Sequence, residues 1–456
     1  MAENTNFKNL INHLKIYGFV WPNSEIYGGI RNQYDWGPLG TEIKRNIKMI
    51  LWDYFIKNES EQKVLGFDGA ILSNQKTWIN SLHAKLFFDY LSDCKDCKSR
   101  FKIDEFNQKL NKDNTPEELN ELIASKKLKC LNCNSVNLTL FKKFNMLFNV
   151  NLSLTDDKAI STYLRPETAQ NIFVNLKNIV QSQRLKFPFG IGQIGKAFRN
   201  ETTVGNFIFR TKEFEQFELE YFTFPDEWEK GFSYYLDKIK TFLRNSLQVS
   251  EKLFNNYFSE HYHSKDELAH YSKKTLDICF KFPFGEKELL GLAYRSDYDL
   301  LCHFPKEKIT FIDQNKQIKF IPHVVEFSIG IERLLLVILT LGYFEDSINN
   351  RVVLKLPVNL APYKIAVLPL VGKFKAQSYE IYKNLKKDFS VVYDDSGSIG
   401  KRYYRQDAIG TPYCVTFDYD SIDTQTVTIR ERDSTNQQRY KIQDLMTYFK
   451  NKINYS

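Results

Sequence analysis

The clearest alternation of polar and apolar residues in this chain begins after Phe209. In an extended strand, successive side chains point to opposite faces. One face would carry Arg210, Lys212, Phe214, Gln216 and Glu218, and the other Glu213, Glu215, Phe217, Leu219 and Tyr221. Just upstream, Arg199 and Glu201 share a face across Asn200. The pattern predicts two strands joined by a polar loop, with cations, an aromatic ring and carboxylates on one sheet surface.

The same stretch opens with two glycine patterns that imitate phosphate-binding loops. Gly190, Gly192 and Gly195 spell GxGxxG, and Gly190 to Lys196 spell GxxxxGK. Such loops join a strand to a helix, and the second kind needs a Ser or Thr where this chain has Ala197. Because the following residues continue as a strand, we expect glycines that allow close strand packing.

Hydrophobic periodicity predicts further helices and strands along the chain. Apolar residues at helical spacing predict helices over residues 1–22, 41–57 and 225–272, the second of which could pack in a core or against a second subunit. Residues 322–344 predict a strand carrying Glu326 and Ser328, a glycine turn and a wholly buried helix. Arg333, in the first turn of that helix, would then need an anion. A phosphate and a protein carboxylate are equally good candidates.

The pattern changes near Leu356. Short β-rich runs alternate with helices at about 376–387 and 441–452, which predicts a separate α/β domain. Between its strands lies a basic stretch in which Lys401, Arg402 and Arg405 alternate with Tyr403 and Tyr404. Basic residues beside aromatic rings suit RNA, although a solvated basic loop would look the same.

Composition narrows the class of protein. A chain of 456 residues is long enough for two or three domains, and 43% hydrophobic residues indicate well-formed cores. The 63 Lys and Arg exceed the 55 Asp and Glu by 8, which permits a polyanionic partner without requiring one. The N-terminus lacks the apolar run and cleavage site of a signal peptide, and the most apolar segment, 334–344, is too short for a bilayer. We expect a cytoplasmic protein without a membrane partner.

Four of the seven cysteines form two CxxC pairs, Cys94 with Cys97 and Cys130 with Cys133. Four thiolates at this spacing predict a tetrahedral structural zinc site, with free thiols as the alternative. The intervening segment contains its own helix start, because Thr115, Pro116 and Glu118 match a cap, a first-turn proline and a capping-box glutamate.

Some candidate residues have ordinary explanations when each is considered alone. Glu167 could simply interact with the dipole of the helix that follows it, and Glu288 could be a surface residue. His261, His263 and His270 lie in a charged stretch, which favours a solvated face over a metal site.

Taken together, the motifs resemble one family, the homodimeric class II glycyl-tRNA synthetases. FRNE at 198–201 with FRTKEFEQFE at 209–218 is similar to class II motif 2, and GIER at 330–333 to motif 3. YGGIRNQYDWGPLG with the helix after it resembles the motif 1 region, and GKRYYRQDAIGTPYCVTFD the anticodon-binding domain. The resemblance covers nearly the whole chain in the right order. It implies an α+β fold: a class II catalytic domain at 1–355, built on an antiparallel sheet flanked by helices, and an anticodon-binding domain at 356–456. Within the first domain we expect a CxxC insertion at about 92–145 and a helical insertion at about 225–280.

The resemblance also implies roles for individual residues. Arg199 would hold the α-phosphate and the substrate carboxylate, and Glu201 would approach the adenine. Arg210 and Arg333 would contact the outer phosphates, and Phe214 would stack beneath the base. The implied catalytic residues are Arg199, Glu201, Arg210 and Arg333. The implied ATP-binding set is Arg199, Asn200, Glu201, Phe209, Arg210, Thr211, Lys212, Glu213, Phe214, Glu288, Leu289, Gly330, Ile331, Glu332 and Arg333. The implied glycine-binding set is Arg100, Glu167, Phe214, Glu215, Gln216, Phe217, Glu218, Glu326, Phe327, Ser328, Ile329 and Gly330.

The implied activity is ATP-dependent attachment of glycine to tRNA(Gly) by a homodimer, with Mg²⁺ accompanying ATP near Glu288 and structural Zn²⁺ on the cysteines. Lys401, Arg402, Tyr403 and Arg405 would contact the RNA. The alternative is a synthetase-like RNA-binding factor without ligase activity. One departure is visible: the family usually has Glu-Pro-Ser where this chain has Glu326, Phe327 and Ser328, which could alter a turn there.

Overall fold

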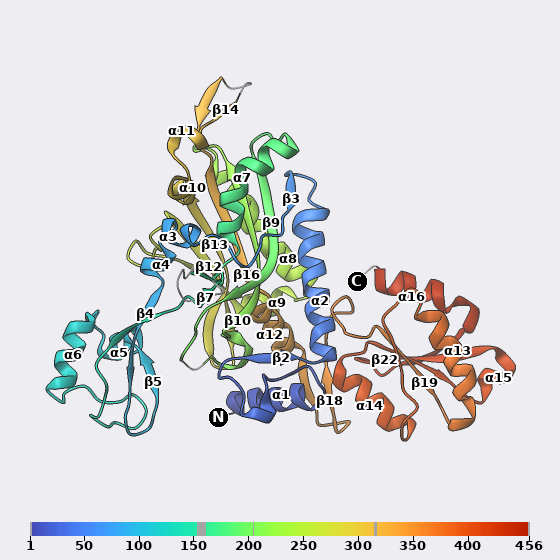
Figure 1. Ribbon diagram of the computed structural model, residues 1–456. Coiled ribbons are helices and arrows are strands. Elements are labelled where there is room, and N and C mark those ends of the chain that lie inside the picture. The colour runs from blue at the N-terminus through green and yellow to red at the C-terminus, as the bar shows by residue number, and fades with distance from the viewer. Residues whose placement is uncertain (1, 153–160, 204, 314–316, 455–456) are drawn as a thin grey trace.

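The computed structural model describes residues 2–152, 161–203, 205–313 and 317–454. A central unit built on one large sheet lies between two smaller bodies (Figure 1). The cysteine-containing module extends from one side of it, and the C-terminal domain lies on the other. No helix in the described ranges is long and apolar enough to cross a membrane.

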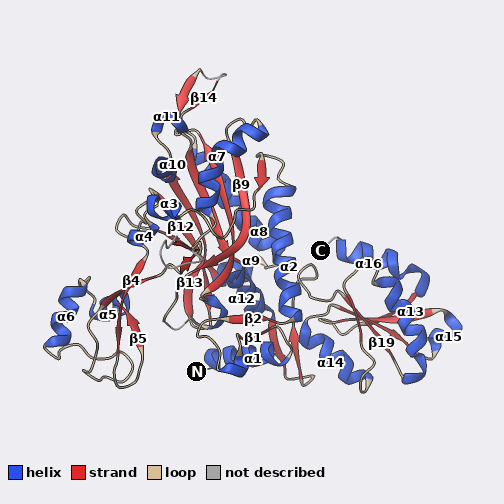
Figure 2. Cartoon of the chain, viewed as in Figure 1, coloured by secondary structure: helices blue, strands red, loops and turns tan. Residues whose placement is uncertain are grey.

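Seven strands form the central sheet, in the order β11-β12-β13-β16-β10-β9-β3 (Figure 2). All neighbouring strands are antiparallel except β3 and β9. Their bounds are β3 Val64–Gly66, β9 Phe189–Phe198, β10 Glu213–Thr223, β11 Phe258–Tyr262, β12 Lys274–Phe282, β13 Gly285–Ser296 and β16 His323–Gly330. The predicted antiparallel sheet flanked by helices is confirmed.

The two faces of strand β10 have different surroundings, as the alternation predicts. Phe217, Leu219 and Tyr221 are buried in the main core. Helices α2 Pro38–Trp52, α8 Trp228–Ser246 and α12 Ile331–Gly342 supply the other side of that core. On the opposite face, α7 Ala169–Gln183 and α10 Tyr298–His303 cover the far ends of β9, β10 and β16 with a second core. Arg210 and Lys212 precede the strand, after a short 3-10 turn at Phe207–Phe209.

The glycine-rich start of β9 forms a strand with no helix after it, so neither phosphate-loop pattern is present. A Cβ on Gly195 would lie 2.2 Å from Arg165 Nη2, and one on Gly192 would lie 2.7 Å from Ile56 Cδ1. Both distances are below van der Waals contact. The glycines therefore allow neighbouring groups to approach the strand, as expected.

The predicted N-terminal helix is shorter than expected. Helix α1 Ala2–Ile16 ends before Gly18, whose φ of 75° interrupts the helix, and Val20–Pro22 forms strand β1 paired with β2 Tyr34–Trp36. The helix predicted over 41–57 is confirmed but begins at Pro38, where proline suits the first turn. It continues as a π-helical turn at Asp53–Lys57.

The helical insertion expected over 225–280 is helical only as far as Tyr257. After α8 and α9 Glu251–Tyr257 the chain forms β11 and, after a loop, β12. Phe258 lies opposite Phe280 in this pair, and Leu276, Ile278 and Phe280 join the main core. Long-range pairing at the sheet edge therefore overrides the local helical pattern.

The cysteine module is a small body with its own core, which includes Phe101, Phe106, Leu119 and Phe141. It consists of β4 Phe88–Asp93, β5 Arg100–Lys102, β6 Lys142–Asn145 and helices α5 Ile103–Leu110 and α6 Pro116–Ala124. The predicted capping box of α6 is confirmed, because Glu118 N donates to Thr115 Oγ1 and Thr115 N donates to Glu118 Oε2.

Shorter elements complete the central unit. These are α3 Gln75–Asn80, α4 His83–Leu86, β7 Asn149–Asn151, β8 Ser161–Tyr163, α11 Lys306–Ile309, β14 Phe311–Asp313, β15 Ile318–Phe320, and the hairpin β17 Tyr343–Asp346 and β18 Arg351–Leu354.

The C-terminal α/β domain is confirmed. Its five-stranded sheet has the order β20-β19-β21-β22-β23. The bounds are β19 Ile365–Pro369, α13 Lys375–Leu385, β20 Val391–Tyr393, α14 Ile399–Ile409, β21 Tyr413–Phe417, α15 Asp420–Thr424, β22 Thr426–Glu431, β23 Gln437–Lys441 and α16 Leu445–Asn454. The stretch treated as a basic loop is the helix α14, capped by the Ser398 side chain. The last helix begins later than 441 because β23 ends there.

Candidate active site

A cavity of about 360 Å³ lies over the polar face of the central sheet. Strands β10, β13 and β16, the loop after β9 and the start of α12 supply its walls. It brings together most of the residues expected from the sequence: Glu167, Arg199, Glu201, Phe209, Arg210, Thr211, Phe214, Gln216, Glu218, Glu288, Leu289, Glu326, Ser328, Gly330, Glu332 and Arg333.

One end of the cavity carries three arginines and two aromatic rings. The Arg333 guanidinium lies 4.6 Å from the centre of the Phe209 ring, and its Nη1 lies 3.1 Å from Glu288 Oε2. Arg333 thus has a protein carboxylate as its partner and still faces the cavity. The Glu288 side chain remains 47% exposed, and the Arg333 charge lowers the pKa of its carboxyl.

Arg199 is held by the backbone of a neighbouring loop. Its Nε donates to Pro166 O at 3.0 Å, and its guanidinium lies 5.4 Å from the centre of the Phe214 ring. Arg210 Nε lies 4.0 Å from Glu201 Oε2, and Arg210 is 37% exposed. These cations are therefore oriented towards the cavity without being fully neutralised, an arrangement suited to phosphate groups.

Carboxyl groups gather at the other end of the cavity. Glu218 accepts hydrogen bonds from the Thr168 hydroxyl and, at 2.8 Å, from Thr168 N. Glu326 pairs with Arg295, whose Nε and Nη2 also donate to Asp299 at 2.7 Å. Glu167 does not cap the helix that follows. Its carboxylate accepts from Gln170 Nε2 at 3.1 Å and lies 3.4 Å from His83 Nε2.

The pKa values at this end of the cavity reflect burial and mutual repulsion. Burial raises the pKa of Glu218 to about 8, and the charges of Glu167 and Glu326 add to the increase. Burial likewise raises the pKa of Glu326 against the opposing effect of Arg295. For Glu167, burial would raise the pKa, but His83 and Arg295 hold it below its ordinary value. Several carboxyl groups thus lie in a site that would gain from a bound cation.

Glu220 lies behind this group, directly opposite Glu326 in the β10–β16 pair. Its side chain is fully buried, and neither carboxylate oxygen has a hydrogen-bond partner among the described residues. Burial raises its pKa well above the ordinary value. Burial of this carboxyl group therefore favours its protonated form.

Several residues expected in the site lie elsewhere. Glu213 pairs with Lys196, Lys212 donates to Asn200 at 2.7 Å, and Arg100 pairs with Asp93 in the cysteine module. Phe217, Phe327, Ile329 and Ile331 are buried in the main core beneath the sheet. The positions of these residues do not support the predicted contacts with ligands.

Phe327, the departure from the family pattern, points away from the cavity. Its ring packs on Phe55, with centroids 4.9 Å apart, and strand β16 continues through it with partners on both sides. The expected change of turn is absent from this described strand. The substitution instead fills the core side of the sheet.

Glu215 belongs to a buried ion cluster beneath the cavity. Lys44 Nζ of helix α2 lies 2.7 Å from Glu215 Oε2 and 2.6 Å from Glu332 Oε1. Glu332 Oε2 in turn accepts from Glu215 N at 2.9 Å, and Lys48 Nζ lies 2.8 Å from Glu215 Oε1. The cluster fixes the residues that adjoin Phe214 and Arg333.

Some residues of the cavity were missed by sequence reasoning. They are His263, Tyr271 and Asp277 along the lining and, behind it, Arg295 with Asp299, since Arg295 pairs with the lining residue Glu326. Ala293, two residues before Arg295 on β13, lines the cavity, but a register shift between Tyr294 and Ser296 interrupts the alternation, so counting along the strand does not place Arg295. His263 is paired with Asp277 at 2.8 Å, a contact between distant residues that no local pattern shows.

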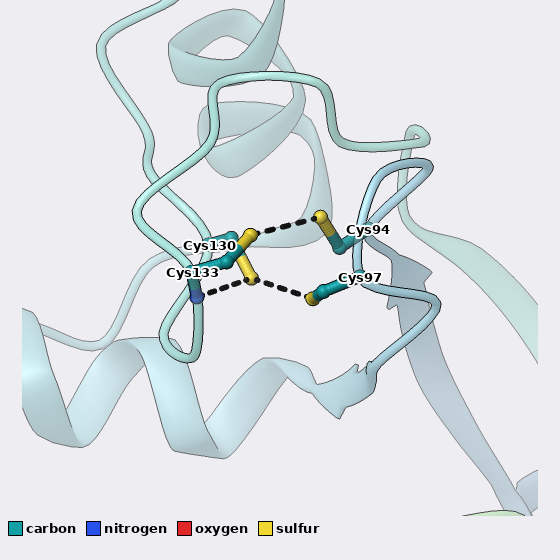
Figure 3. Close-up of side chains that lie close together, drawn as sticks. All are labelled: Cys94, Cys97, Cys130 and Cys133. Carbon is teal, nitrogen blue, oxygen red and sulfur yellow. Dashed lines mark hydrogen bonds between the residues drawn. The ribbon is translucent and has the colours of Figure 1, made fainter.

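The four cysteines converge in the cysteine module (Figure 3). Their sulfur atoms all lie within 4.8 Å of one another, with Cys94 3.6 Å from Cys133 and Cys97 3.6 Å from Cys130. In a tetrahedral zinc site with Zn–S bonds of about 2.3 Å, sulfur atoms lie about 3.8 Å apart. The geometry therefore fits a metal ion. Among the His, Cys, Asp and Glu side chains of the described ranges, this group of four has ligand atoms spaced closely enough to hold a metal ion.

The four residues expected to contact RNA lie on α14 in unlike settings. Arg402 is buried, and it donates to Pro369 O and, at 2.6 Å, to Gly397 O. The Tyr403 hydroxyl is bonded to the Thr416 hydroxyl at 2.7 Å, and Arg405 pairs with Asp394 at 2.8 Å. Lys401 is exposed.

Comparison with known proteins places this geometry in a family. The class II core domain of tRNA synthetases (G, H, P, S and T) matches residues 148–341, and the anticodon binding domain matches 364–452. The glycine–tRNA ligase of Mesoplasma florum is 46% identical over 98% of this chain and 100% of its own length. This chain belongs to the glycine–tRNA ligase family. The ligase of Malacoplasma penetrans is 49% identical over 98% of this chain and 97% of the relative, and that of Caldanaerobacter subterraneus is 46% identical over 96% of each.

Proposed function

We propose that this chain attaches glycine to tRNA(Gly) at the expense of ATP, through a glycyl-adenylate. The observation that carries the proposal is the polarity of the cavity. Arg199 lies over Phe214 and Arg333 over Phe209, near the start of β10, whereas Glu218 and Glu326 lie further along the paired strands β10 and β16. The relatives similar over nearly the full length are named as glycine–tRNA ligases. ATP phosphates would suit the arginine end of the cavity, and the glycine ammonium would suit the carboxylate end.

In the proposed first step, a glycine carboxylate oxygen bonds to the α-phosphorus of ATP, and pyrophosphate leaves with the electrons of the broken P–O bond. Arg199 would stabilise the charge on the α-phosphate, and Arg210 and Arg333 that on the outer phosphates. Phe214 would support the base. Positioning and charge stabilisation account for the chemistry without a protein nucleophile.

In the second step, a ribose hydroxyl at the 3′ end of the tRNA bonds to the glycyl carbonyl carbon and loses its proton, and AMP leaves. The C-terminal domain, which belongs to the anticodon-binding family, would bind the other end of the RNA. The central unit would thus bind ATP and glycine, and the C-terminal domain would bind the tRNA. This agrees with the cavity, whose lining residues all belong to the central unit.

Selection of glycine follows from charge and space. The ammonium would bind among Glu167, Glu218 and Glu326, where carboxyl groups outnumber the guanidinium of Arg295 among the described residues. Because glycine is the smallest amino acid, its site can reject others by steric exclusion.

Two metal ions belong to the proposal. Glu288, a carboxylate at the phosphate end, would hold Mg²⁺ that neutralises part of the ATP charge when bound. Cys94, Cys97, Cys130 and Cys133 would hold a structural Zn²⁺, since four thiolates leave no open position for a reaction. Metal analysis of the purified protein, compared with Cys97→Ser, tests the zinc assignment. Equal zinc in both proteins would refute it.

A homodimer completes the proposal. Ile26, Tyr27 and Ile30 lie between β1 and β2 with exposed fractions of 86%, 86% and 56%, an apolar group that an interface would cover. Sedimentation velocity of the wild type and of Ile26→Asp tests this, and a wild-type monomer at micromolar concentration would overturn it.

Glycine-dependent exchange between ATP and pyrophosphate tests the central claim. We expect exchange with glycine and none with alanine or serine. Arg199→Ala and Arg333→Ala should abolish it, whereas Arg439→Met in the C-terminal domain should not. ATP binding by calorimetry without exchange would instead support an RNA-binding factor that has lost the chemistry.

A further inference from the structure

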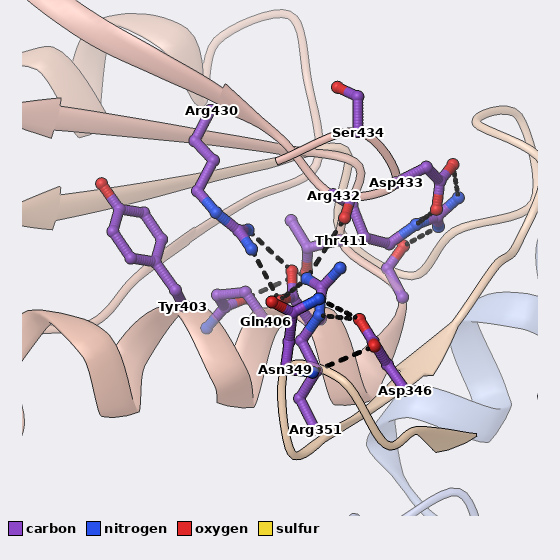
Figure 4. A network of polar contacts seen from close by, with 12 residues as sticks. Asp346, Asn349, Arg351, Tyr403, Gln406, Thr411, Arg430, Arg432, Asp433 and Ser434 are labelled. Atoms are coloured by element: carbon purple, nitrogen blue, oxygen red, sulfur yellow. Dashed lines mark hydrogen bonds and ion pairs between the residues drawn. The ribbon is translucent and has the colours of Figure 1, made fainter. Parts of the chain in front are cut away.

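The C-terminal domain is joined to the central unit by a network of charged side chains that is buried except at Asp433 (Figure 4). We define the domain-joining network as Asp346 and Arg351 of the β17–β18 hairpin with Asp407, Arg430, Arg432 and Asp433 of the C-terminal domain. Hairpin and domain side chains meet at the end of α14. None of these residues lines the catalytic cavity.

Asp407 is the centre of this network. Its side chain has no exposed surface, and Arg430 donates two hydrogen bonds to it, at 2.8 and 2.9 Å, from within the C-terminal domain. Arg351 donates to the same carboxylate from the hairpin, and its Nε donates to Asp346 at 2.9 Å. Arg351 therefore connects the two bodies through carboxylates on both sides.

Backbone contacts reinforce the junction around the same helix end. His13 Nε2 of α1 donates to Ala408 O at 2.7 Å, and Arg351 Nη1 donates to Arg432 O at 3.3 Å. Gly410, which ends α14 with a φ of 86°, lies so close to the hairpin of the central unit that a Cβ would be 3.0 Å from Leu354 O at the end of β18. The surfaces are in close contact as well as bonded.

Breaking such a junction is unfavourable because it removes an ion pair between two buried side chains. Interfaces between domains are often polar and permit motion, but separating these bodies would break the Arg351–Asp407 pair and leave Arg351 with Asp346 of the hairpin and Asp407 with Arg430 of its own domain. The side chains of Arg351 and Asp407 are 5% and 0% exposed. The C-terminal domain should thus be held at one orientation relative to the cavity.

We propose that Arg351, through Asp407, is a positioning residue that fixes the C-terminal domain so that an RNA bound there presents its distant 3′ end to the cavity. The inference rests on the proposed function for its choice of RNA. It assigns to a residue outside the cavity an effect on the tRNA-dependent step alone. The adenylation step, which needs only the central unit, should proceed without it.

The test uses the full-length protein and separates the two steps. Arg351→Met should raise the KM for tRNA in aminoacylation about tenfold, while exchange parameters for ATP and glycine stay within about twofold. Arg351→Lys, which keeps the charge, should recover part of the effect. Arg439→Met removes an arginine paired with Asp418 inside the C-terminal domain and serves as the matched control.

Solution X-ray scattering measures whether the two bodies remain close together. Arg351→Met should give a larger radius of gyration than the wild type and Arg439→Met, whether or not the chain is a ligase. If wild-type exchange with glycine is absent, the proposed function fails while this structural expectation is still tested. An unchanged KM for tRNA despite a loosened domain would overturn the proposal, as would a parallel loss of exchange, aminoacylation and thermal stability. If Arg351→Met does not fold, the same readouts on Arg351→Lys decide.

Discussion

The carboxylate end of the cavity and the domain-joining network are both buried clusters of Asp, Glu and Arg, but their charges are balanced differently. In the network, three arginines face three aspartates, and Asn349 and Arg351 lower the pKa of Asp346 to about 2. In the cavity, Glu167, Glu218, Glu220, Glu326 and Asp299 surround Arg295, and the pKa of Glu218 is raised to about 8.

The difference shows how to recognise a binding site within a charged protein interior. A structural network pairs its charges, and pairing lowers the pKa of Asp346 and Asp433 here. A site that awaits a cation keeps surplus carboxyl groups, so some of them hold protons until the ligand arrives. At the carboxylate end of the cavity the pKa is raised for Glu218, Glu220 and Glu326, whereas the pKa of Glu167, which lies beside His83, is lowered.

The largest effect should follow from removing Arg295. Arg295→Met would leave Asp299 and Glu326 without their cation, at a cost of about 3–5 kcal/mol in the free energy of unfolding. Glycine-dependent exchange should fall by about 100-fold or more because the carboxylates lose their arrangement. Urea denaturation and exchange assays measure both. Arg351→Met is the comparison from the balanced network, and it should lose stability without losing exchange. If both variants lost exchange equally, the cavity cluster and the domain-joining network would not differ in their effect on catalysis.

Glu218→Gln should change the pH dependence of the free energy of unfolding. The folded-state pKa of about 8 lies above the ordinary 4.5, so the proton on Glu218 stabilises the fold fully below pH 4.5 and this contribution is lost as pH rises through 8. The stability of the wild type relative to Glu218→Gln should therefore fall across this window, by at most about 1.4 kcal/mol per pH unit.

The KM for glycine provides a second readout. Binding of an ammonium favours ionised Glu218, so the wild-type KM should decrease as pH rises towards 8. In Glu218→Gln that decrease should be absent or much smaller. Thermal and urea unfolding between pH 5 and 9, with exchange kinetics at the same values, measure both effects. Parallel pH profiles for the two proteins would show that Glu218 does not change its protonation state between pH 5 and 9.

The Lys44 cluster offers a second balanced group, close to the cavity. Lys44→Met should raise the KM for ATP about tenfold with little change in the KM for glycine, because Glu215 and Glu332 adjoin Phe214 and Arg333. Lys48→Met is the matched control, since Lys48 contacts Glu215 from a side chain that is 34% exposed. A similar increase for both variants would indicate general charge loss instead of positioning.

The smallest effect should come from the surface of α14. Lys401→Ala should raise the KM for tRNA only about two- to threefold and leave the melting temperature unchanged, as expected for one exposed phosphate contact. Arg402→Ala, one residue away, should lower the melting temperature because it removes a buried side chain bonded to Pro369 O. Calorimetry and aminoacylation assays on the two variants measure this pair. An unaltered KM for tRNA in Lys401→Ala would remove α14 from the RNA-binding surface.

Sequence patterns predicted those parts of the fold that depend on local periodicity. The alternation along β10, the buried helix after Gly330 and the capping box at Thr115 all follow from neighbouring residues. The edge strand β11 and its neighbour β12 were missed because their pairing brings together residues distant in the chain, such as Phe258 and Phe280. Local propensity gives no account of such partners.

The candidate site shows the same division. The residues that line the cavity from β10 and β16 are found by counting along each strand, but Lys44 and Arg295 act through partners far away in the chain. The glycine motif at 190–195 was correctly dismissed because its context lacked a helix. The helix α14 was read as a loop because its basic face resembles a solvated segment, whereas Arg402 is buried.

The two-sided central sheet also divides the mutations that this protein can accept. On β10 and β16 the even-numbered residues, such as Glu218 and Glu326, face the ligand side, and the odd-numbered residues, such as Phe217 and Phe327, face the core. Substitutions of one parity can therefore change the substrate while those of the other change the melting point. A library randomised at odd positions should yield variants that differ in thermostability and share one amino-acid preference. Phe327, in place of the family's proline, is a natural instance of such a change.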